Sequence, residues 1–316
     1  MSDVAAHYAA LLNAEVLPSE AFCLTAVRGV TIEEALTRFD ASLETRPATL
    51  AEAGKAAMTA YPDDLPVITA SEVGGWVFLA ADNGWHGAMP EVLTRLSAGT
   101  VATTAYWNVN LNNTLALAED GRLSEMDFVL DDEPPEELAG HVAGLDFEGD
   151  DLCGSALAFV ERVTGVRLDE DWARTPWPTA VISSPLRFES SGPTGWLQGN
   201  APELLEGFAG ADEEVLREVA ALAADRACAA TGVEDRQASV HGTHLQALNL
   251  RWDRCGPVPS GADPAAERLL VSRAHALAAV RACEHGDPFT AAAQALINAC
   301  QADREHWPEL RELVAR

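Results

Sequence analysis

The type of secondary structure that the sequence favours changes near residue 180. Before that point, short apolar runs alternate with glycine-containing turns, whereas alanine-rich segments with helical spacing follow it. A chain of 316 residues is long for a single hydrophobic core, so we expect two domains, at residues 1–180 and 181–316. The order of the elements predicts an α+β domain followed by a mainly α-helical region.

Turn signals set the expected order of the strands in the first domain. Gly74-Gly75 and Asp120-Gly121 are typical of tight connections between antiparallel strands. Thr31 and Glu34 have the spacing of a capping box, which predicts a helix running to about Phe39. We therefore expect a mixed or antiparallel meander sheet with inserted helices, and strands near 22–27, 67–70, 76–81, 100–108, 114–118 and 122–130.

Two segments are predicted to be irregular, and a third cannot be assigned to one type of element. Pro134-Pro135 predicts an irregular acidic loop over 131–151, and four prolines mark 176–193 as the linker between the domains. The partial alternation of 241–252 is compatible with a strand or a loop. Helices are expected at 3–13, 90–98, 152–164, 202–208, 212–230, 263–284 and 288–303.

The net charge of −28 is concentrated in one part of the chain. Residues 119–171 hold seventeen acidic side chains and three arginines, whereas residues 251–316 hold nine acidic side chains and eight arginines. This distribution argues against nucleic acid as a ligand and favours a basic protein partner or a solvated acidic face. The nearly neutral last stretch permits a homodimer through the C-terminal helices.

The sequence has no membrane-spanning or secretory signal that we can identify. It contains no apolar run of about 18 residues, and its first twenty residues carry acidic side chains where a signal peptide has basic ones. The six cysteines are scattered, as expected of buried thiols in a reducing compartment. We expect a cytoplasmic protein that does not contact a membrane.

Several motifs, in order, resemble a family of unknown function found in actinobacteria. The resemblance covers about residues 20–180 and implies a fold unit without an activity that can be transferred. The motifs that carry it are the run 22–31 (Phe-Cys-Leu-Thr-Ala-Val-Arg-Gly-Val-Thr), Trp76, Asn83-Gly84-Trp85-His86-Gly87, Leu96-Ser97-Ala98-Gly99, Asn108-Val109-Asn110, Asp120-Gly121 and 164–168 (Thr-Gly-Val-Arg-Leu).

The segment 83–87 is the first candidate for a ligand-binding site. Its glycines allow a close approach of the backbone, Trp85 offers a stacking surface, and His86 can transfer a proton. The competing interpretation is a tight turn whose tryptophan fills the edge of the core. The candidate ligand-binding residues are Asn83, Trp85, His86 and Trp107, and a pocket at the domain junction would add Trp172, Trp177 and Trp196.

The remaining motifs favour a protein without a metal or cofactor. His241 and His244 with Cys255 are the nearest approach to zinc spacing, but the second pair, Cys283 and His285, is distant in sequence. We therefore expect no metal and no cofactor. The chain also lacks a nucleophile elbow, a Walker loop, a dinucleotide-binding fingerprint and the H-E-x-x-H motif, which removes common enzyme classes and leaves catalytic residues unknown.

The favoured hypothesis is a non-catalytic interaction protein. An acidic face would dock a basic protein, as an immunity protein or inhibitor does, and the alternative is an enzyme or small-ligand-binding protein with a Trp/His-lined pocket. Docking and simple solvation of the acidic side chains remain open. The candidate partner-binding residues are Asp131, Asp132, Glu133, Glu136, Glu137, Asp150 and Asp151.

Overall fold

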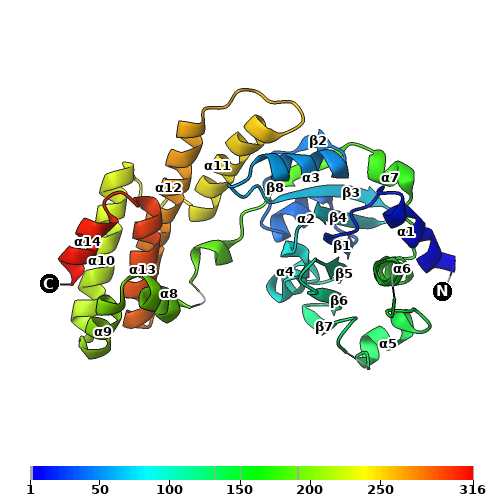
Figure 1. Ribbon diagram of the computed structural model, residues 1–316, viewed down its shortest axis with the longest axis horizontal. Helices are drawn as coiled ribbons and strands as arrows, with labels where there is room; N and C mark the ends of the chain where they lie inside the picture. Colours follow the sequence, from blue (N-terminus) through cyan, green and yellow to red (C-terminus); the bar gives the residue numbers. More distant parts are fainter. Residues whose placement is uncertain (1–2, 132, 150, 191, 316) are drawn as a thin grey trace. The chain divides into compact units, whose positions relative to one another are not determined.

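The computed structural model describes residues 3–131, 133–149, 151–190 and 192–315. The chain forms two compact units (Figure 1). The N-terminal unit comprises Met1–Ile182 with Cys255–Pro259, and the C-terminal unit comprises Ser183–Arg254 with Ser260–Arg316.

The N-terminal unit is built on one eight-stranded sheet whose paired strands are all antiparallel. This confirms the predicted α+β class and the inserted helices. Two strands interrupt the expected meander, because β1 lies between β4 and β5 and β8 returns between β2 and β3. In spatial order the strands are β2 (Arg46–Ala48), β8 (Trp177–Val181), β3 (Val67–Val73), β4 (Trp76–Asp82), β1 (Phe22–Arg28), β5 (Val101–Trp107), β6 (Asn113–Glu119) and β7 (Arg122–Met126).

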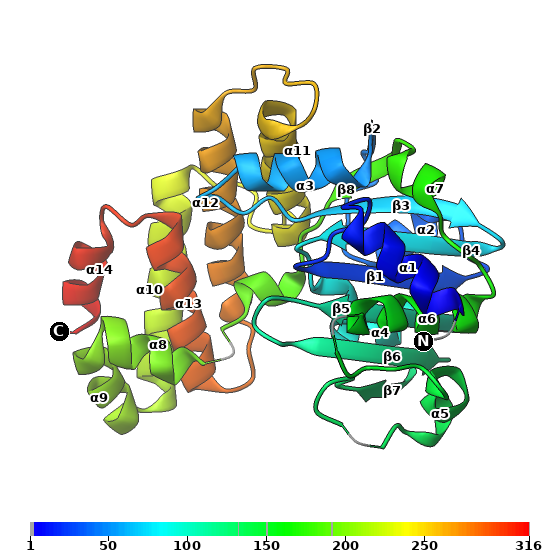
Figure 2. The ribbon, with the colours of Figure 1, turned by 45° about the vertical axis from the view of Figure 1, so that its right-hand side comes forward.

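Helices cover both faces of this sheet (Figure 2). Leu24 and Phe78 face one apolar core with α1 and α6, whereas Val27 and Leu79 face a second core with α2 and α4. Because both faces are buried, the central strands read as nearly continuous apolar runs in the sequence. The helices of this unit are α1 (Asp3–Asn13), α2 (Ile32–Arg38), α3 (Leu50–Thr59), the 3₁₀ turn η1 (His86–Ala88), α4 (Pro90–Leu96), α5 (Glu136–Val142), α6 (Leu152–Thr164) and α7 (Glu170–Arg174).

Proline misled the sequence interpretation at two places. The prediction of an irregular loop over 131–151 is wrong over 136–142, where α5 forms with Pro135 as its N-cap, a position at which a missing N–H costs little. The prediction of a linker over 176–193 is also wrong in its first part, because Pro178 lies within β8, between β2 and β3. The strand expected over 122–130 ends at Met126.

The capping boxes also differ from the expectation. The Thr31 hydroxyl accepts a hydrogen bond from the Glu34 amide, but the Glu34 carboxylate pairs with Arg38 at 2.6 Å. A reciprocal capping box forms instead between Thr49 and Glu52, at the start of α3.

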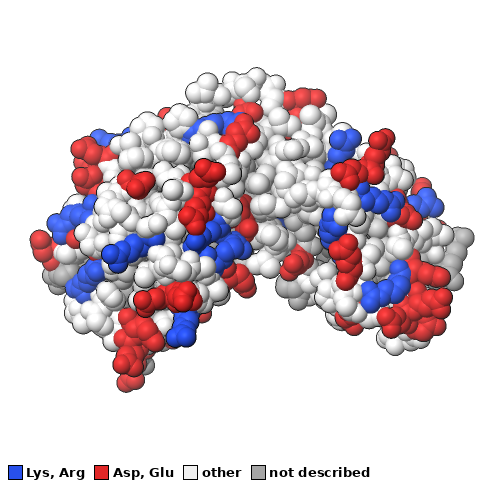
Figure 3. Space-filling model, turned by 180° about the vertical axis from the view of Figure 1, so that it is seen from behind, with Lys and Arg blue, Asp and Glu red and all other residues white. Residues whose placement is uncertain are grey.

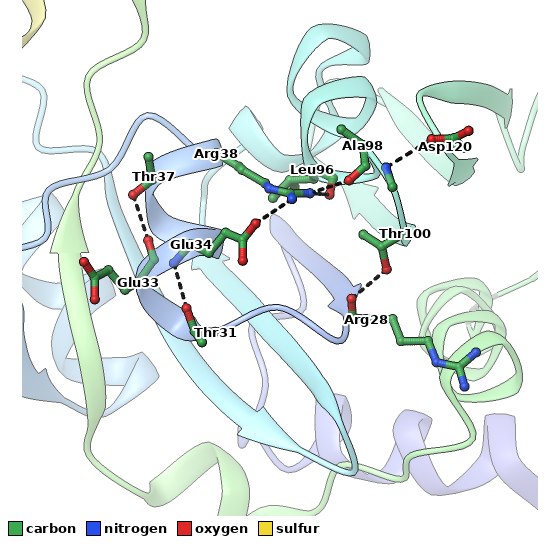
Figure 4. A network of polar contacts seen from close by, with 11 residues as sticks. Arg28, Thr31, Glu33, Glu34, Thr37, Arg38, Leu96, Ala98, Thr100 and Asp120 are labelled. Atoms are coloured by element: carbon green, nitrogen blue, oxygen red, sulfur yellow. Dashed lines mark hydrogen bonds and ion pairs between the residues drawn. The ribbon is translucent and has the colours of Figure 1, made fainter.

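One end of the sheet is held closed by hydrogen bonds between its connections (Figure 4). The Arg38 guanidinium donates to the carbonyl oxygens of Leu96 and Ala98, at 2.8 and 2.9 Å. The Thr100 hydroxyl donates to the Arg28 carbonyl at 2.6 Å, and the Asp120 carboxylate accepts from the Gly99 amide. These contacts satisfy the free carbonyls at the end of α4 and fix the turns on this side.

The C-terminal unit is helical. Its centre is formed by α10, α12 and α13, which pack through alanines such as Ala220, Ala279 and Ala295. None of the helices in the described residues has the length and apolarity needed to span a membrane. The helices are the 3₁₀ turn η2 (Pro185–Phe188), α8 (Pro193–Asn200), α9 (Pro202–Gly210), α10 (Glu213–Thr231), α11 (Val240–Cys255), α12 (Pro264–Ala282), α13 (Pro288–Ala302) and α14 (Trp307–Val314).

The expectation of a strand or loop over 241–252 is wrong, because this segment forms most of α11. Leu248 and Trp252 are buried and lie four residues apart, which is helical spacing. Ala247, next to Leu248 in the sequence, is also buried. This additional apolar residue made the apolar pattern of 241–252 resemble the alternation of a strand.

A buried ion pair joins α11 to α12. The Glu267 carboxylate is 2% exposed and accepts hydrogen bonds from Arg251 Nε at 2.6 Å and from the Arg254 guanidinium at 2.9 Å. The two arginines compensate the desolvated carboxylate, so removal of the acid would take away the negative charge that faces the buried Arg251 guanidinium.

We expect Glu267→Gln to lower the free energy of unfolding by about 3–5 kcal/mol, since it breaks a buried pair on one side only. Asp225→Asn, which removes an exposed pair with Arg236, serves as the control and should cost less than about 1 kcal/mol. Urea unfolding followed by circular dichroism measures both. Equal losses in the two variants would contradict this account of Glu267.

Candidate binding surface at one end of the sheet

The strand register brings three distant connections to the same end of the sheet. Phe22 lies opposite Asp82 on one side and Trp107 on the other, and Trp107 lies opposite Asn113. Leu115 in turn lies opposite Met126, the last residue of β7. The segments 83–89, 108–112 and 127–131 therefore leave or enter the sheet together (Figure 2), and we call this set the loop end.

Exposed apolar side chains gather at the loop end. Single apolar residues on a surface are ordinary, but several on adjoining loops mark a surface that is suited to binding. The loop end contains no lysine or arginine. Its apolar side chains, which are 44–75% exposed, are Trp85, Val109, Leu111, Val129 and Leu130.

A hollow of about 560 Å³ opens beside Trp85. We call it the Trp85 hollow, and it is formed by the N-terminal unit alone. Of the described residues that line it, only Glu91 carries a formal charge. Burial raises the pKa of Tyr106, whose hydroxyl accepts a hydrogen bond from Asn108, so the phenol is neutral. The lining residues are Trp85, Ala88, Met89, Pro90, Glu91, Tyr106, Asn108, Asn112 and Thr114.

Short-range hydrogen bonds hold the connections around the hollow. The Asn108 side-chain oxygen accepts from the backbone amides of Asn110 and Asn112, at 2.9 and 3.1 Å. In the neighbouring loop, the Asp127 carboxylate accepts from the amides of Val129 and Leu130. Because the backbone is fixed in this way, the exposed apolar side chains are presented in defined positions.

The turn 83–87 depends on glycine for packing. A Cβ atom on Gly87 would lie 2.1 Å from the Thr25 hydroxyl, and one on Gly84 would lie 2.5 Å from the Ala81 Cβ. Asn83 is exposed and has a left-handed backbone, with φ of +53°. These constraints fit the tight-turn interpretation of the segment, except that Trp85 points to solvent and does not fill the core edge.

His86 fastens this turn to the end of α2. Its Nε2 donates to the Phe39 carbonyl at 3.1 Å and lies 3.7 Å from the Asp40 carboxylate, which Arg95 also contacts. Burial alone would raise the pKa of Asp40, but the nearby His86 ring and the Arg95 guanidinium outweigh it and hold that pKa below its ordinary value. His86 is thus engaged in structure and does not line the Trp85 hollow.

Trp107 does not belong to this surface. It is 2% exposed, packs against Phe22 in the core and donates through its indole nitrogen to the Ser19 carbonyl. Trp172 is buried and bonds to Ser71, while Trp196 packs against Trp307 within the C-terminal unit. Sequence reasoning therefore found Trp85 but missed its neighbours Met89, Glu91, Tyr106, Asn112 and Thr114.

Asp82 is the carboxyl group with a raised pKa near the loop end. Burial is the main cause, and the negative charge of Glu20 adds to it. A raised carboxyl pKa suits a general acid, but neither Asp82 nor His86 is among the described residues that line the hollow. The arrangement supports binding better than catalysis.

Acidic side chains extend from the loop end over the β7–α5 connection. Figure 3 shows acidic side chains gathered at the lower left, over this part of the N-terminal unit. We call this set the acidic surface: Asp127, Asp131, Glu133, Glu136 and Glu137. None of the ion pairs found among the described residues involves the acidic surface.

The other acidic candidates are distributed differently. Asp132 and Asp150 lie outside the described residues, and Asp151 is the N-cap of α6. Asp169, which belongs to the same charge concentration, caps α7, and α7 packs against α3. The charge concentration at 119–171 is therefore divided between two regions of the N-terminal unit. Figure 3 also shows acidic side chains in the C-terminal unit, at the lower right.

The histidines of the C-terminal unit form a buried polar cluster. His244 is 3% exposed, and its Nδ1 lies 2.7 Å from the Ser183 hydroxyl. Phe188 packs edge-on between His244 and His275, and His275 donates to the Asn298 side-chain oxygen. Burial lowers the pKa of His244 to about 3, helped by the positive charges of Arg187 and nearby groups.

Metal-ligand geometry is missing from this cluster. Helix α11 carries both His241 and His244, yet the described residues contain no group of three histidine, cysteine or acidic side chains that could hold a metal ion. Cys255, Cys283 and the other cysteines are free thiols.

We expect acid to destabilise the C-terminal unit through His244. The folded state resists protonation because the pKa is lowered, so the unfolded state takes up the proton as the pH falls below about 6.5. Between pH 7 and 5.5 this histidine should lower the free energy of unfolding by about 1 kcal/mol, and His275 acts in the same direction.

An NMR pH titration, assigned with His244→Gln, tests this directly, and His285→Gln provides an exposed control. The His244 ring signals should not titrate above pH 5. Titration near pH 6.5 would contradict the burial argument.

Comparison with known proteins identifies the family of the chain but gives no activity for it. No curated protein and no solved structure matches the chain. The model of DUF6461, described as a family of unknown function, matches residues 1–184, which contain the first and longer segment of the N-terminal unit, Met1–Ile182, but not its second segment, Cys255–Pro259. The resemblance predicted from the motifs in 20–180 is therefore confirmed, and the chain belongs to this family of unknown function, DUF6461.

Proposed function

We propose that this protein is a non-catalytic, cytoplasmic interaction protein that docks a basic protein partner, in the manner of an immunity protein or inhibitor. The single observation that carries the proposal is the combination, in one unit, of exposed apolar side chains at the loop end with the adjoining acidic surface. The free state of all six cysteines supports a reducing compartment.

Apolar contact and charge would have separate roles in docking. The apolar side chains supply the surface that is removed from water, which provides most of the affinity. The acidic surface attracts a basic partner over a distance and raises the association rate. A solvated acidic face with no partner needs no exposed apolar loops beside it, so docking explains both features together.

Neutralising the acidic surface should slow association with the partner. We would identify the proteins captured by the wild type from its host, whatever their charge, purify them and measure association rates at low and high salt. The rate for the wild type should fall about tenfold as salt rises from 50 to 300 mM, because exposed charges are screened. Glu136→Gln/Glu137→Gln should lower the low-salt rate several-fold.

The matched control is Glu214→Gln/Glu218→Gln, which removes two exposed glutamates from α10 in the other unit. This control should associate at the wild-type rate. A partner that is not basic, a rate independent of salt, or equal effects of the two double variants would overturn the proposal.

We also propose that the C-terminal helices support a homodimer. A hollow of about 540 Å³ among α10, α12, α13 and α14 is lined by alanines and the exposed apolar residues Leu269 and Leu313, together with charged side chains that include Arg226, Asp303, Glu305 and Glu309. Light scattering of the full chain should give the mass of a dimer, and Leu269→Ser/Leu313→Ser should shift it to a monomer. A wild-type monomer at high concentration would contradict the proposal.

A further inference from the structure

We infer that the Trp85 hollow is an arginine pocket, which takes one guanidinium side chain of the basic partner. The inference deepens the proposed function and rests on it. It follows from the chemistry of the lining, which combines an exposed indole, a neutral phenol, one carboxylate and several amide or hydroxyl oxygens.

The indole of Trp85 provides the stacking surface. It is 59% exposed, although the turn that carries it is fixed by Gly84, Gly87 and His86. A cation over the face of a tryptophan is attracted by the ring quadrupole, and an arginine adds planar stacking. Because the turn is already rigid, little conformational entropy is lost when a side chain stacks on the indole.

The charge of the lining selects a cation. Glu91, in the first turn of α4, is its one formally charged residue among those described, and no lysine or arginine of the described chain lines the hollow. A phosphate or carboxylate ligand would meet this carboxylate without compensation, whereas a guanidinium pairs with it.

The polar groups favour a guanidinium over an ammonium ion. A guanidinium has five N–H donors in a plane, and the Asn112 side-chain oxygen and the Thr114 hydroxyl can accept from them. Asn108 is already occupied by its bonds to Tyr106, Asn110 and Asn112, so it holds the wall of the pocket instead of binding the ligand. Guanidinium is also less strongly hydrated than ammonium, so it is easier to bring against Met89 and Pro90.

The test uses the full chain and three blocked peptides in which alanine alternates with arginine, lysine or citrulline. Citrulline keeps the shape of arginine and removes its charge. The arginine peptide should bind several-fold more tightly than the lysine peptide, and the citrulline peptide should not bind measurably. Trp85→Ala should weaken the arginine peptide about tenfold, Trp85→Phe by less, and Glu91→Gln several-fold. Isothermal titration calorimetry measures all of these affinities.

Val215→Ala, which truncates an exposed apolar residue of α10, is the control and should leave the peptide affinities unchanged. Thermal melting confirms that the Trp85 variants are folded. The inference is overturned if Trp85→Ala binds the arginine peptide as the wild type does, or if the citrulline peptide binds equally well.

The two proposals fail in different ways. If Glu136→Gln/Glu137→Gln weakens the arginine and lysine peptides equally while Trp85→Ala does not, the acidic surface stands and the arginine pocket is wrong. If Trp85→Ala weakens the arginine peptide while the glutamine variant binds normally, the pocket stands and the docking role of the acidic surface is wrong.

Discussion

Burial of both faces of the central sheet decides where the N-terminal unit can bind anything. With α1 and α6 on one face and α2 and α4 on the other, the strands contribute their side chains to two apolar cores. Such a sheet offers a partner only its edges and the connections at its two ends. Its edges are short, because β2 has three residues and β7 has five.

The two ends of the sheet differ in how their polar groups are used. At the end that contains Arg38, Thr100 and Asp120, side chains bond to the backbone of neighbouring connections and close the surface (Figure 4). At the loop end, Asn108 and Asp127 bond within their own loops, so these two loops are held in place while their apolar side chains remain exposed. Rigid loops that present apolar and aromatic groups are what a binding surface requires.

The sequence predicted those parts of the fold that depend on local signals. Gly74-Gly75 and Asp120-Gly121 identified the turns of two hairpins, and the helix expected at 152–164 is α6. Errors arose where a local signal has two meanings. Proline breaks a helix internally yet begins one at Pro135, and it was unexpected in a strand paired on both sides, as at Pro178.

The loop end could not be predicted, because it depends on which strands are neighbours. Trp85 was identified from its turn, but its proximity to Asn112 and Thr114 follows from the position of β1 between β4 and β5, which leaves no local trace in the sequence. Trp107 was grouped with Trp85 by residue type. Its side chain is not at the loop-end surface, because it faces α1 and α6 in the core.

In the proposed docking, charge and aromatic contact at the loop end have different physical roles. Charge attracts a partner from a distance, and aromatic contact distinguishes one cation from another. A field of carboxylates draws in any cation and distinguishes poorly between lysine and arginine, since it acts at a distance and is screened by salt. Contact with Trp85 acts only at short range and depends on the shape and hydration of the cation. A surface that has the first without the second would bind basic proteins quickly but without selectivity. In the docking function that we propose, Trp85 and Glu91, which line one hollow beside the acidic surface, would provide the selectivity that the field alone lacks.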